Sequence, residues 1–400
     1  MRVIGIDMHR SFAVVAMLED GAMRSGGRVE LVRHQILAFG RTLRPDDELV
    51  LEATGNTMAI VRLLRPFVGR IAVANPRQVR AIAHARVKTD KVDAATLAKL
   101  HASGFLPEVW QPDEATEGLR RVVAQRARVV AQMTRLKNRV QAVLHANLIP
   151  EYRGVLFSGR GRRWLTEQPL AEDEREAVRR HLAELDRLTV DRAAFDQRLA
   201  QQARADERVR RLMTINGVHV TVAVSLLAAI GDIARFRSAA KLASYFGLTP
   251  RIRQSGNSPA QHGRISKEGR AHARAMLVEA AWAAKSTPGP LRAFFRRIAI
   301  KRGQPVAAVA TARKLAVLVW HLLSQGEDYA WSRPALLAAK LRRAALDAGA
   351  PSERGKPGAA SAYSFKAVRE RERAWIEQAE GAYERFVANW LTAPVRKPGA

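Results

Sequence analysis

The chain has 400 residues, 47% of them hydrophobic, and carries 67 Lys and Arg residues against 38 Asp and Glu, a formal net charge of +29. This is enough apolar sequence for two or three folded domains, and so large a positive charge points to a polyanionic partner, most commonly nucleic acid. The absence of cysteine excludes disulfides, thiolate zinc sites and cysteine nucleophiles.

The chain gives no sign of a membrane or of export. Residues 1–7 lack a signal-peptide pattern, and no run of about 18 apolar residues without charge appears, so no membrane span is expected. Basic residues run the length of the chain instead of forming one amphipathic tail, which disfavours an anionic membrane as the partner. We therefore expect a cytoplasmic, nucleoid-associated protein of a bacterium or archaeon.

The first hundred residues predict a mixed sheet covered by helices. Short apolar runs predict strands at residues 3–7, 11–18, 28–32, 48–53 and 70–74. Helices are expected at 36–43, at 58–67, from Pro76 and from Thr89 or Asp90. Strands that first form hairpins and then alternate with helices are typical of an α/β fold.

Four acidic residues lie where such a fold would bring carboxylates together. Asp7 and Glu52 each end a predicted strand, and Asp90 and Asp93 share one face of a helix start. Singly, each has an ordinary interpretation as a polar strand end or as an acidic first turn favoured by the helix dipole. Together they would require divalent cations, and two ions can clamp the attacking and leaving oxygens of a phosphodiester. We interpret the set as a two-metal site for Mg²⁺, with Mn²⁺ as the alternative ion.

These residues carry a family resemblance. Asp, then Glu, then Asp-x-x-Asp on this strand pattern resembles the RNase H-like fold of Holliday-junction resolvases. Residues 3–7, 51–57 (LEATGNT) and 88–98 (KTDKVDAATLA) resemble the N-terminal domain of the DEDD transposases of bacterial insertion sequences. That family is related to Piv-type DNA invertases and is known as bridge-RNA-guided serine recombinases.

Two long charged helices are expected after a proline-flanked linker around Trp110. Apolar residues at heptad-like spacing from Leu119 to Val143, interrupted by Arg126, and others in a second region at 172–211, predict an antiparallel coiled-coil hairpin with arms of about 40 residues. A basic, irregular turn running to Arg163 would join them. We favour a spacer and dimerisation arm, because charge runs on helices are usually solvated. The alternative is a nucleic-acid surface formed by Arg120, Arg121, Arg126, Arg128, Arg135, Lys137 and Arg139.

Two further turns are expected in the helical region that follows. Gly217 lies between residues 212–216 and an apolar helix at 221–230, which resembles a helix-hairpin-helix whose amides hold a phosphate. An ordinary helical turn is an equal alternative. Gly247 is expected to cap a helix containing Tyr245.

A basic, glycine-rich segment follows at 247–270. Glycines near Ser255 free its backbone to approach a ligand, so Ser255 is either an activated nucleophile or part of a loop that binds phosphate passively. Ser258 is interpreted as a loop residue and Ser266 as the N-cap of the next helix. Together with Arg274 the segment has six basic residues and one acid, Glu268, and the expected nucleic-acid ligands are Arg251, Arg253, Arg264, Lys267 and Arg270.

This segment extends the resemblance. GLTPRIRQSGN and HGRISKEGRAHAR, and then Lys301-Arg302-Gly303 with residues 307–329, resemble the C-terminal domain of the same transposase family. The resemblance covers roughly residues 1–329. Beyond Trp331 no family pattern appears, and we expect a linker at 351–361, a helix at 363–391 and a basic tail.

The expected domains are an RNase H-like metal domain at 1–108, a coiled-coil hairpin at 109–205, a helical serine-bearing domain at 206–330 and an extension at 331–400. The resemblance implies Mg²⁺ at the four acids, and Ser255 attacking DNA to form a covalent phosphoserine intermediate. It also implies donor and target DNA, a non-coding bridge RNA, and a homo-oligomer, dimer or tetramer, in which the catalytic domains can meet across protomers.

Two alternatives stay open. One is a metal-dependent Holliday-junction nuclease that uses water, with Ser255 as a phosphate ligand only. The other is a basic nucleic-acid-packaging protein, against which the ordered set of acids argues.

Overall fold

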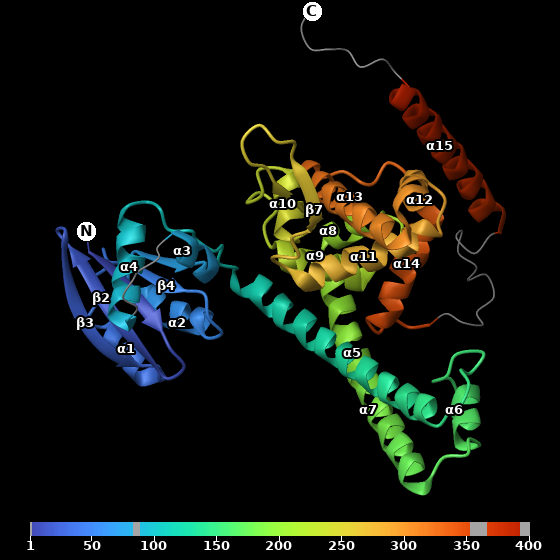
Figure 1. Cartoon of the computed structure of the whole chain (residues 1–400), viewed down its shortest axis with the longest axis horizontal. Coiled ribbons are helices and arrows are strands. Elements are labelled where there is room, and N and C mark those ends of the chain that lie inside the picture. The colour runs from blue at the N-terminus through green and yellow to red at the C-terminus, as the bar shows by residue number, and fades with distance from the viewer. Residues whose placement is uncertain (1, 83–88, 353–365, 393–400) are drawn as a thin grey trace, which may run out of the picture. The chain divides into compact units, whose positions relative to one another are not determined.

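The computed structural model of the chain describes residues 2–82, 89–352 and 366–392, the last without the side chains of 390–392. It separates into two compact units, Met1–Asp113 and Glu114–Ala400 (Figure 1). Lys88, most of the predicted linker at 351–361 and the predicted basic tail lie outside the described residues.

A five-stranded sheet in the order β3-β2-β1-β4-β5 organises the first unit. Strands β1, β2 and β3 pair antiparallel, whereas β4 and β5 continue the sheet parallel to β1. The predicted mixed α/β sheet is therefore confirmed, and its order is consistent with an RNase H-like fold. The strands are β1 (Val3–Met8), β2 (Phe12–Glu19), β3 (Ala22–Glu30), β4 (Glu48–Glu52) and β5 (Arg70–Ala74).

Edge strand β3 was predicted too short. The strand begins at Ala22 and not at residue 28. Its first half is polar and exposed, and its register shifts at a bulge opposite Val15 and Ala16. An exposed, bulged edge strand lacks the apolar run on which the strand predictions depended.

Helices cover both faces of the sheet (Figure 1). Ile4 and Ile6 of β1 point into a core formed with α1 (Arg33–Gly40) and α2 (Thr57–Leu64), which leads into the 3-10 turn Arg65–Phe67. Val3 points to the opposite face, which packs against α3 (Pro76–Ile82) and α4 (Asp90–Ala102). Successive strand residues face opposite sides, so Val3, Gly5 and Asp7 share the α4 face.

Two long antiparallel helices begin the second unit (Figure 1), namely α5 (Glu114–Ala146) and α7 (Glu172–Ala203). Val129, Met133 and Leu136 of α5 pack against Leu185 and Leu188 of α7, as the apolar stripe predicts. The helices have 33 and 32 residues, so the predicted arms were too long. The heptad geometry of a true supercoil stays a prediction.

The connections around this hairpin differ from the prediction at two places. The turn predicted as irregular contains α6 (Gly159–Thr166), whose first turn is capped by the Ser158 hydroxyl accepting from Gly161 N. The region predicted as one helix to Arg211 breaks after α7, because Asp206 caps a new helix, α8 (Glu207–Met213), by accepting from Arg208 N. A capping side chain thus starts a helix within the predicted turn, and another divides the predicted second helix despite its continuous apolar periodicity.

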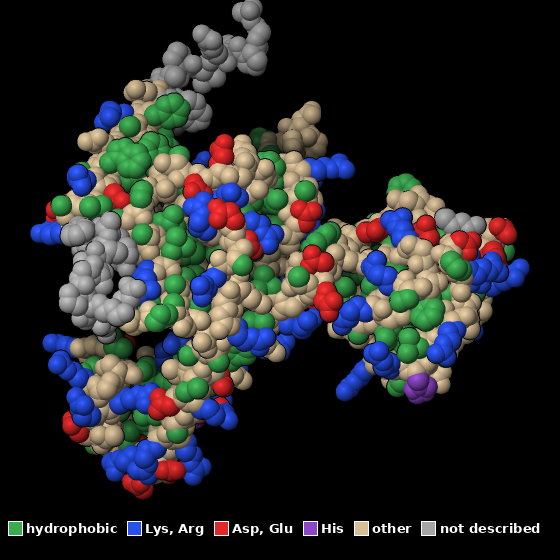
Figure 2. All heavy atoms as spheres, turned by 180° about the vertical axis from the view of Figure 1, so that it is seen from behind, with side chains coloured by type: hydrophobic (Ala, Val, Ile, Leu, Met, Phe, Trp, Pro, Cys, Tyr) green, Lys and Arg blue, Asp and Glu red, His purple; other side chains and the backbone are tan. Residues whose placement is uncertain are grey.

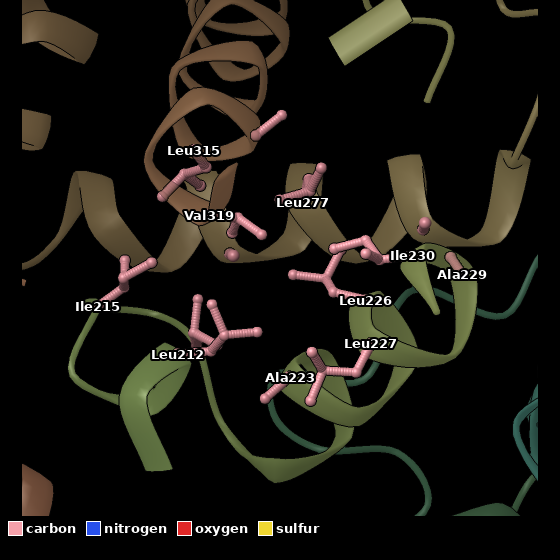
Figure 3. Close-up of a cluster of buried hydrophobic side chains, with 14 of the residues drawn as sticks. Leu212, Ile215, Ala223, Leu226, Leu227, Ala229, Ile230, Leu277, Leu315 and Val319 are labelled. Atoms are coloured by element: carbon pink, nitrogen blue, oxygen red, sulfur yellow. The ribbon is translucent and has the colours of Figure 1, made fainter. Parts of the chain in front are cut away.

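A helical core fills the rest of the unit, and its helices are α9 (Val220–Ile230), α10 (Ala239–Tyr245), α11 (Ala271–Lys285), α12 (Pro290–Arg302) and α13 (Gln304–Gln325). Figure 3 shows Leu315 and Val319 of α13 pointing toward Leu277 of α11 and the side chains of α9. Gly217 lies in the α8–α9 turn, where an added Cβ would lie 2.5 Å from the carbonyl oxygen of Ala280. The glycine is thus needed for close packing on α11. Phosphate binding at this turn stays a prediction.

Helix α13 is long and apolar enough to cross a membrane by length and composition, with a mean hydropathy of 1.5. No such stretch was expected from the sequence. Its residues Ala312, Leu315, Ala316 and Val319 are fully buried in the core, which accounts for the apolar composition without a membrane.

The extension beyond Trp331 is integrated into this unit. Helix α14 (Pro334–Asp347) packs on α7 and α8, and the Lys340 ammonium group donates to the carbonyl oxygens of Met213 and Ile215 at 2.7 and 2.8 Å. Helix α15 (Lys366–Thr392), close to the predicted bounds, packs on α12, where the buried Glu380 carboxylate pairs with Arg292. These contacts attach the extension to the helical core.

Candidate metal centre and serine hairpin

The first candidate site lies where the parallel strands β1 and β4 end. Their register pairs Ile6 with Leu51, so Asp7 and Glu52 follow at the same edge of the sheet. Asp7 is on the face that α4 covers. This is the arrangement that the strand-end acids predicted.

Gly5 lets α4 approach the strand. An added Cβ at Gly5 would lie 2.0 Å from the carbonyl oxygen of Ala94, so only glycine permits this contact. The Thr89 side chain caps α4 by accepting from Val92 N at 3.3 Å. Cap and close contact together hold the first turn of α4, with Asp90 and Asp93, beside the end of β1.

Asp7 and Asp90 form a group with His9, a residue that the sequence analysis did not select. The His9 Nε2 atom lies 3.3 Å from Asp7 Oδ2 and 3.2 Å from Asp90 Oδ2. One ligand atom from each of the three lies within 4.8 Å of the others. The sequence feature that could have identified His9 is its position two residues after Asp7, in a turn that the sequence analysis treated only as a connection between two strands.

The site concentrates negative charge. Burial is the main cause that raises the pKa of the Asp7 carboxyl, and the nearby Asp93 and Asp90 carboxylates raise it further, whereas His9 opposes the shift. A bound cation would relieve this repulsion. The effect of Asp93 on the pKa of Asp7 also shows that the two carboxylates lie near each other.

Glu52 and Asp93 are not in the three-residue group. The turn after Glu52 is fixed by Thr57, whose hydroxyl donates to the Glu52 carbonyl oxygen at 2.8 Å and accepts from Thr54 N at 2.7 Å. Of the four predicted acids, the structure therefore brings together Asp7 and Asp90, places Asp93 nearby, and leaves Glu52 at the adjacent strand end.

An open groove of about 590 Å³ adjoins Asp90 within the first unit. Its lining includes the aromatic ring of Phe12 and the basic side chains of Arg28 and Lys91. Positive groups beside a carboxylate site could accommodate a phosphate backbone next to a metal ion.

The second candidate site is a hairpin that was predicted as a loop. Strands β6 (Pro250–Arg253) and β7 (Gln261–Ile265) pair antiparallel, and Ser255 lies in the connection between them. The strands are short, rich in arginine and mostly exposed, so they lack the apolar alternation that predicts a half-buried strand. Ser255 is exposed, and its hydroxyl makes no hydrogen bond within the described part of the chain. Gly256 beside it has a φ of +53°, in the left-handed region.

Basic side chains surround this hairpin. The predicted ligands Arg251, Arg253, Arg264 and Lys267 are all exposed. Arg270 is also exposed but is held by Tyr245, whose hydroxyl oxygen accepts from Arg270 Nε at 2.7 Å.

Ser266 is not the predicted N-cap. Helix α11 begins at Ala271, and the Ser266 hydroxyl instead accepts from Glu268 N at 3.3 Å. Positive φ angles at Lys267 and Gly269 turn the chain before the helix starts.

The two candidate sites lie in different units, since the acids belong to Met1–Asp113 and Ser255 to Glu114–Ala400. A reaction that uses both sites therefore requires the two units to meet, either within one chain or between chains of an assembly.

Comparison with known proteins gives consistent matches in both units. The family model described as "Transposase IS116/IS110/IS902 family" matches residues 209–296, and a DEDD transposase model described as "Transposase" matches residues 4–148. A putative transposase, y4qE, of Sinorhizobium fredii is 30% identical over 71% of this chain and 72% of its own length.

More distant relatives include a transposase and a gene-inverting protein. The transposase for insertion sequence element IS1111A of Coxiella burnetii is 26% identical over 82% of this chain and 91% of its own. The pilin gene-inverting protein of Moraxella bovis is 27% identical over 70% of this chain and 81% of its own.

Proposed function

Because the chain belongs to the IS110/IS116 family of DEDD transposases, enzymes of insertion sequences that cut and rejoin DNA, we propose that its two units supply the two halves of one strand-transfer site. The carboxylates of the first unit hold divalent metal, and Ser255 of the second unit is the nucleophile. The observation that carries this proposal is the convergence of Asp7 and Asp90 at the end of β1, supported by an exposed serine among arginines.

The residues at the strand ends fit a divalent cation. The family implies metal dependence, and the donor set of carboxylates and an imidazole nitrogen suits such an ion. We assign Asp7, Glu52, Asp90 and Asp93 as the ligands of two such ions, with Mg²⁺ as the physiological ion and Mn²⁺ as the alternative. When bound, the metal would supply positive charge beside the oxygens of the phosphate whose phosphorus is attacked.

In this proposal the Ser255 oxygen forms a bond to a DNA phosphorus while the bond from that phosphorus to a deoxyribose oxygen breaks. The serine proton passes to solvent or to a carboxylate, and the released deoxyribose oxygen takes up a proton. The number of phosphoester bonds is unchanged, so a second deoxyribose hydroxyl can reverse the step and rejoin the strands without an energy source. Arg251, Arg253 and Arg264 on the same hairpin stabilise the charge on the phosphate.

The partners are proposed on the same basis. DNA is the substrate of the family, and we propose a structured non-coding RNA as a guide on the remaining basic surface. Figure 2 shows many Lys and Arg side chains on the second unit, including its helical hairpin. We assign the α5–α7 hairpin to dimer or tetramer formation, which would let Ser255 of one protomer meet the acids of another.

A trapping experiment tests the serine. The full chain is incubated with Mg²⁺, its co-purified RNA and DNA that carries an element end, and is then denatured and analysed by mass spectrometry. The proposal predicts DNA joined to the peptide containing Ser255, and loss of the adduct in Ser255→Ala but not in Ser258→Ala. Cleavage by Ser255→Ala, with no adduct in the wild type, would instead support the nuclease that uses water.

A further inference from the structure

His9 extends the acidic site beyond its four carboxylates. We propose that His9 is a nitrogen ligand of the divalent ion held by Asp7 and Asp90, and that it shifts the preference of the site from Mg²⁺ toward Mn²⁺. This inference rests on the metal site proposed above, and concerns which ion that site selects.

The spacing of the three donor atoms suits one ion. Neighbouring ligands of an octahedral ion with bonds of about 2.1 Å lie about 3 Å apart. The Nε2 atom of His9 lies 3.3 Å from Asp7 Oδ2 and 3.2 Å from Asp90 Oδ2. At these distances Nε2 still makes no hydrogen bond to any described residue, although the atom itself is buried. The nitrogen is therefore shielded from water and directed at the carboxylates without donating to either.

The imidazole ring is held in this position by the turn between β1 and β2. Its ring stacks on Phe12 with centroids 4.5 Å apart and an interplanar angle of 25°. The His9 backbone N–H donates to the Phe12 carbonyl oxygen at 2.9 Å. Phe12 is in turn covered by the Arg28 guanidinium, 3.8 Å from the ring centre. A ligand fixed by its neighbours loses little freedom when a metal binds.

The chemistry of the donor set decides the selectivity. Carboxylates and water suit Mg²⁺, which binds nitrogen weakly, whereas imidazole strengthens binding of transition metals in the order of the Irving–Williams series. Among the transition metals Mn²⁺ also accepts oxygen ligands readily. One nitrogen in an otherwise oxygen site should therefore favour Mn²⁺ over Mg²⁺.

Pulsed electron paramagnetic resonance of the full chain with one equivalent of Mn²⁺ reads the coordination directly. We expect modulation from a directly bound ¹⁴N nucleus, replaced by the ¹⁵N pattern when the wild-type protein is grown with ¹⁵N-histidine. This readout needs no mutation and no catalysis. His9→Gln should abolish the nitrogen signal and weaken Mn²⁺ binding roughly tenfold, while Mg²⁺ binding changes less than about threefold.

His34→Gln, on an exposed histidine of the same unit, is the matched control and should behave as the wild type. If Asp7→Asn and Asp90→Asn abolish Mn²⁺ binding but the wild type shows no bound nitrogen, His9 only pairs with the carboxylates, and the inference is wrong while the metal site stands. If the two Asn variants bind Mn²⁺ as the wild type does, the proposed metal site fails, and the role of His9 fails with it.

Discussion

Lys340 is a lysine whose ammonium group is almost fully buried, between α14 and the turn that follows α8. It donates to the carbonyl oxygens of Met213 and Ile215, so it satisfies backbone groups that would otherwise lack partners. Burial is the main cause that lowers the pKa of Lys340 to about 8, and the positive charge of Arg333 adds to the shift. One residue of the extension thus links folding to pH.

The sign of this linkage follows from the two pKa values. An unfolded lysine titrates near 10.5, so between pH 8 and 10.5 the unfolded chain binds more protons than the folded chain, and stability rises with pH. From pH 7.5 to 9.5 we expect the free energy of unfolding of the wild type to rise by roughly 2 kcal/mol relative to Lys340→Met. Urea unfolding at several pH values measures the difference. Lys366→Met, on an exposed lysine, is the control and should show the pH dependence of the wild type. If stability plotted against pH has the same slope in Lys340→Met as in the wild type, burial of Lys340 does not link folding to pH.

The contact of α4 with β1 is the structural element on which the metal site depends. Helix α4 approaches the strand closely at Gly5, and this approach sets where its first turn places Asp90 and Asp93. The acids of the motif are therefore necessary for the site but not sufficient, because their position depends on a glycine in another element.

Gly5→Ala should move α4 away from the strand. The new Cβ would lie 2.0 Å from a backbone oxygen that cannot rotate aside, so we expect destabilisation by about 2–3 kcal/mol, together with weaker metal binding. Thermal unfolding and Mn²⁺ titration measure the two effects. Gly55→Ala, where an added Cβ meets nothing within 4 Å, is the control for stability. Unchanged metal affinity in a destabilised Gly5→Ala would show that the helix position does not tune the site.

The net charge of the whole molecule, +29, attracts nucleic acid, but only basic side chains that are not already paired with acids are free to contact phosphates. Many basic residues of the helical hairpin pair with acids of their own helix or its partner, such as Arg126 with Asp196 and Arg179 with Glu172. The arginines of the β6–β7 hairpin are exposed, and no ion pair joins Arg251, Arg253 or Arg264 to a described acid. They are the better candidates for direct phosphate contact.

Salt dependence of duplex binding separates these classes. Each arginine that contacts a phosphate contributes about 0.9 to the slope of log affinity against log salt concentration. Replacing Arg251, Arg253 and Arg264 by Gln should therefore reduce the slope by roughly 2.7, as measured by fluorescence anisotropy. Arg208→Gln removes an exposed arginine that already pairs with Asp206, and should leave the slope nearly unchanged. An unaltered slope in the triple variant would place the phosphate contacts elsewhere.

The parts of the fold and of the site that could be predicted are those that leave a pattern in neighbouring residues of the sequence. Short apolar runs located β1, β2, β4 and β5, because strands whose residues are mostly buried must be apolar, and the acids at the ends of β1 and β4 located the site. Strand β3 and the β6–β7 hairpin were missed or shortened because exposed strands need no apolar alternation. His9 was missed because its meaning depends on Asp90, which is distant in the sequence and adjacent only after folding.

The sequence by itself determined the family, the mixed sheet, the long helical pair and the basic character of the molecule, since these follow from residue type and periodicity. Only the tertiary structure decided which side chains meet. It brought His9 between Asp7 and Asp90, attached Lys340 to the α8–α9 turn, and fixed α4 against Gly5. Such contacts join residues far apart in the chain, and their geometry depends on packing that no local pattern encodes.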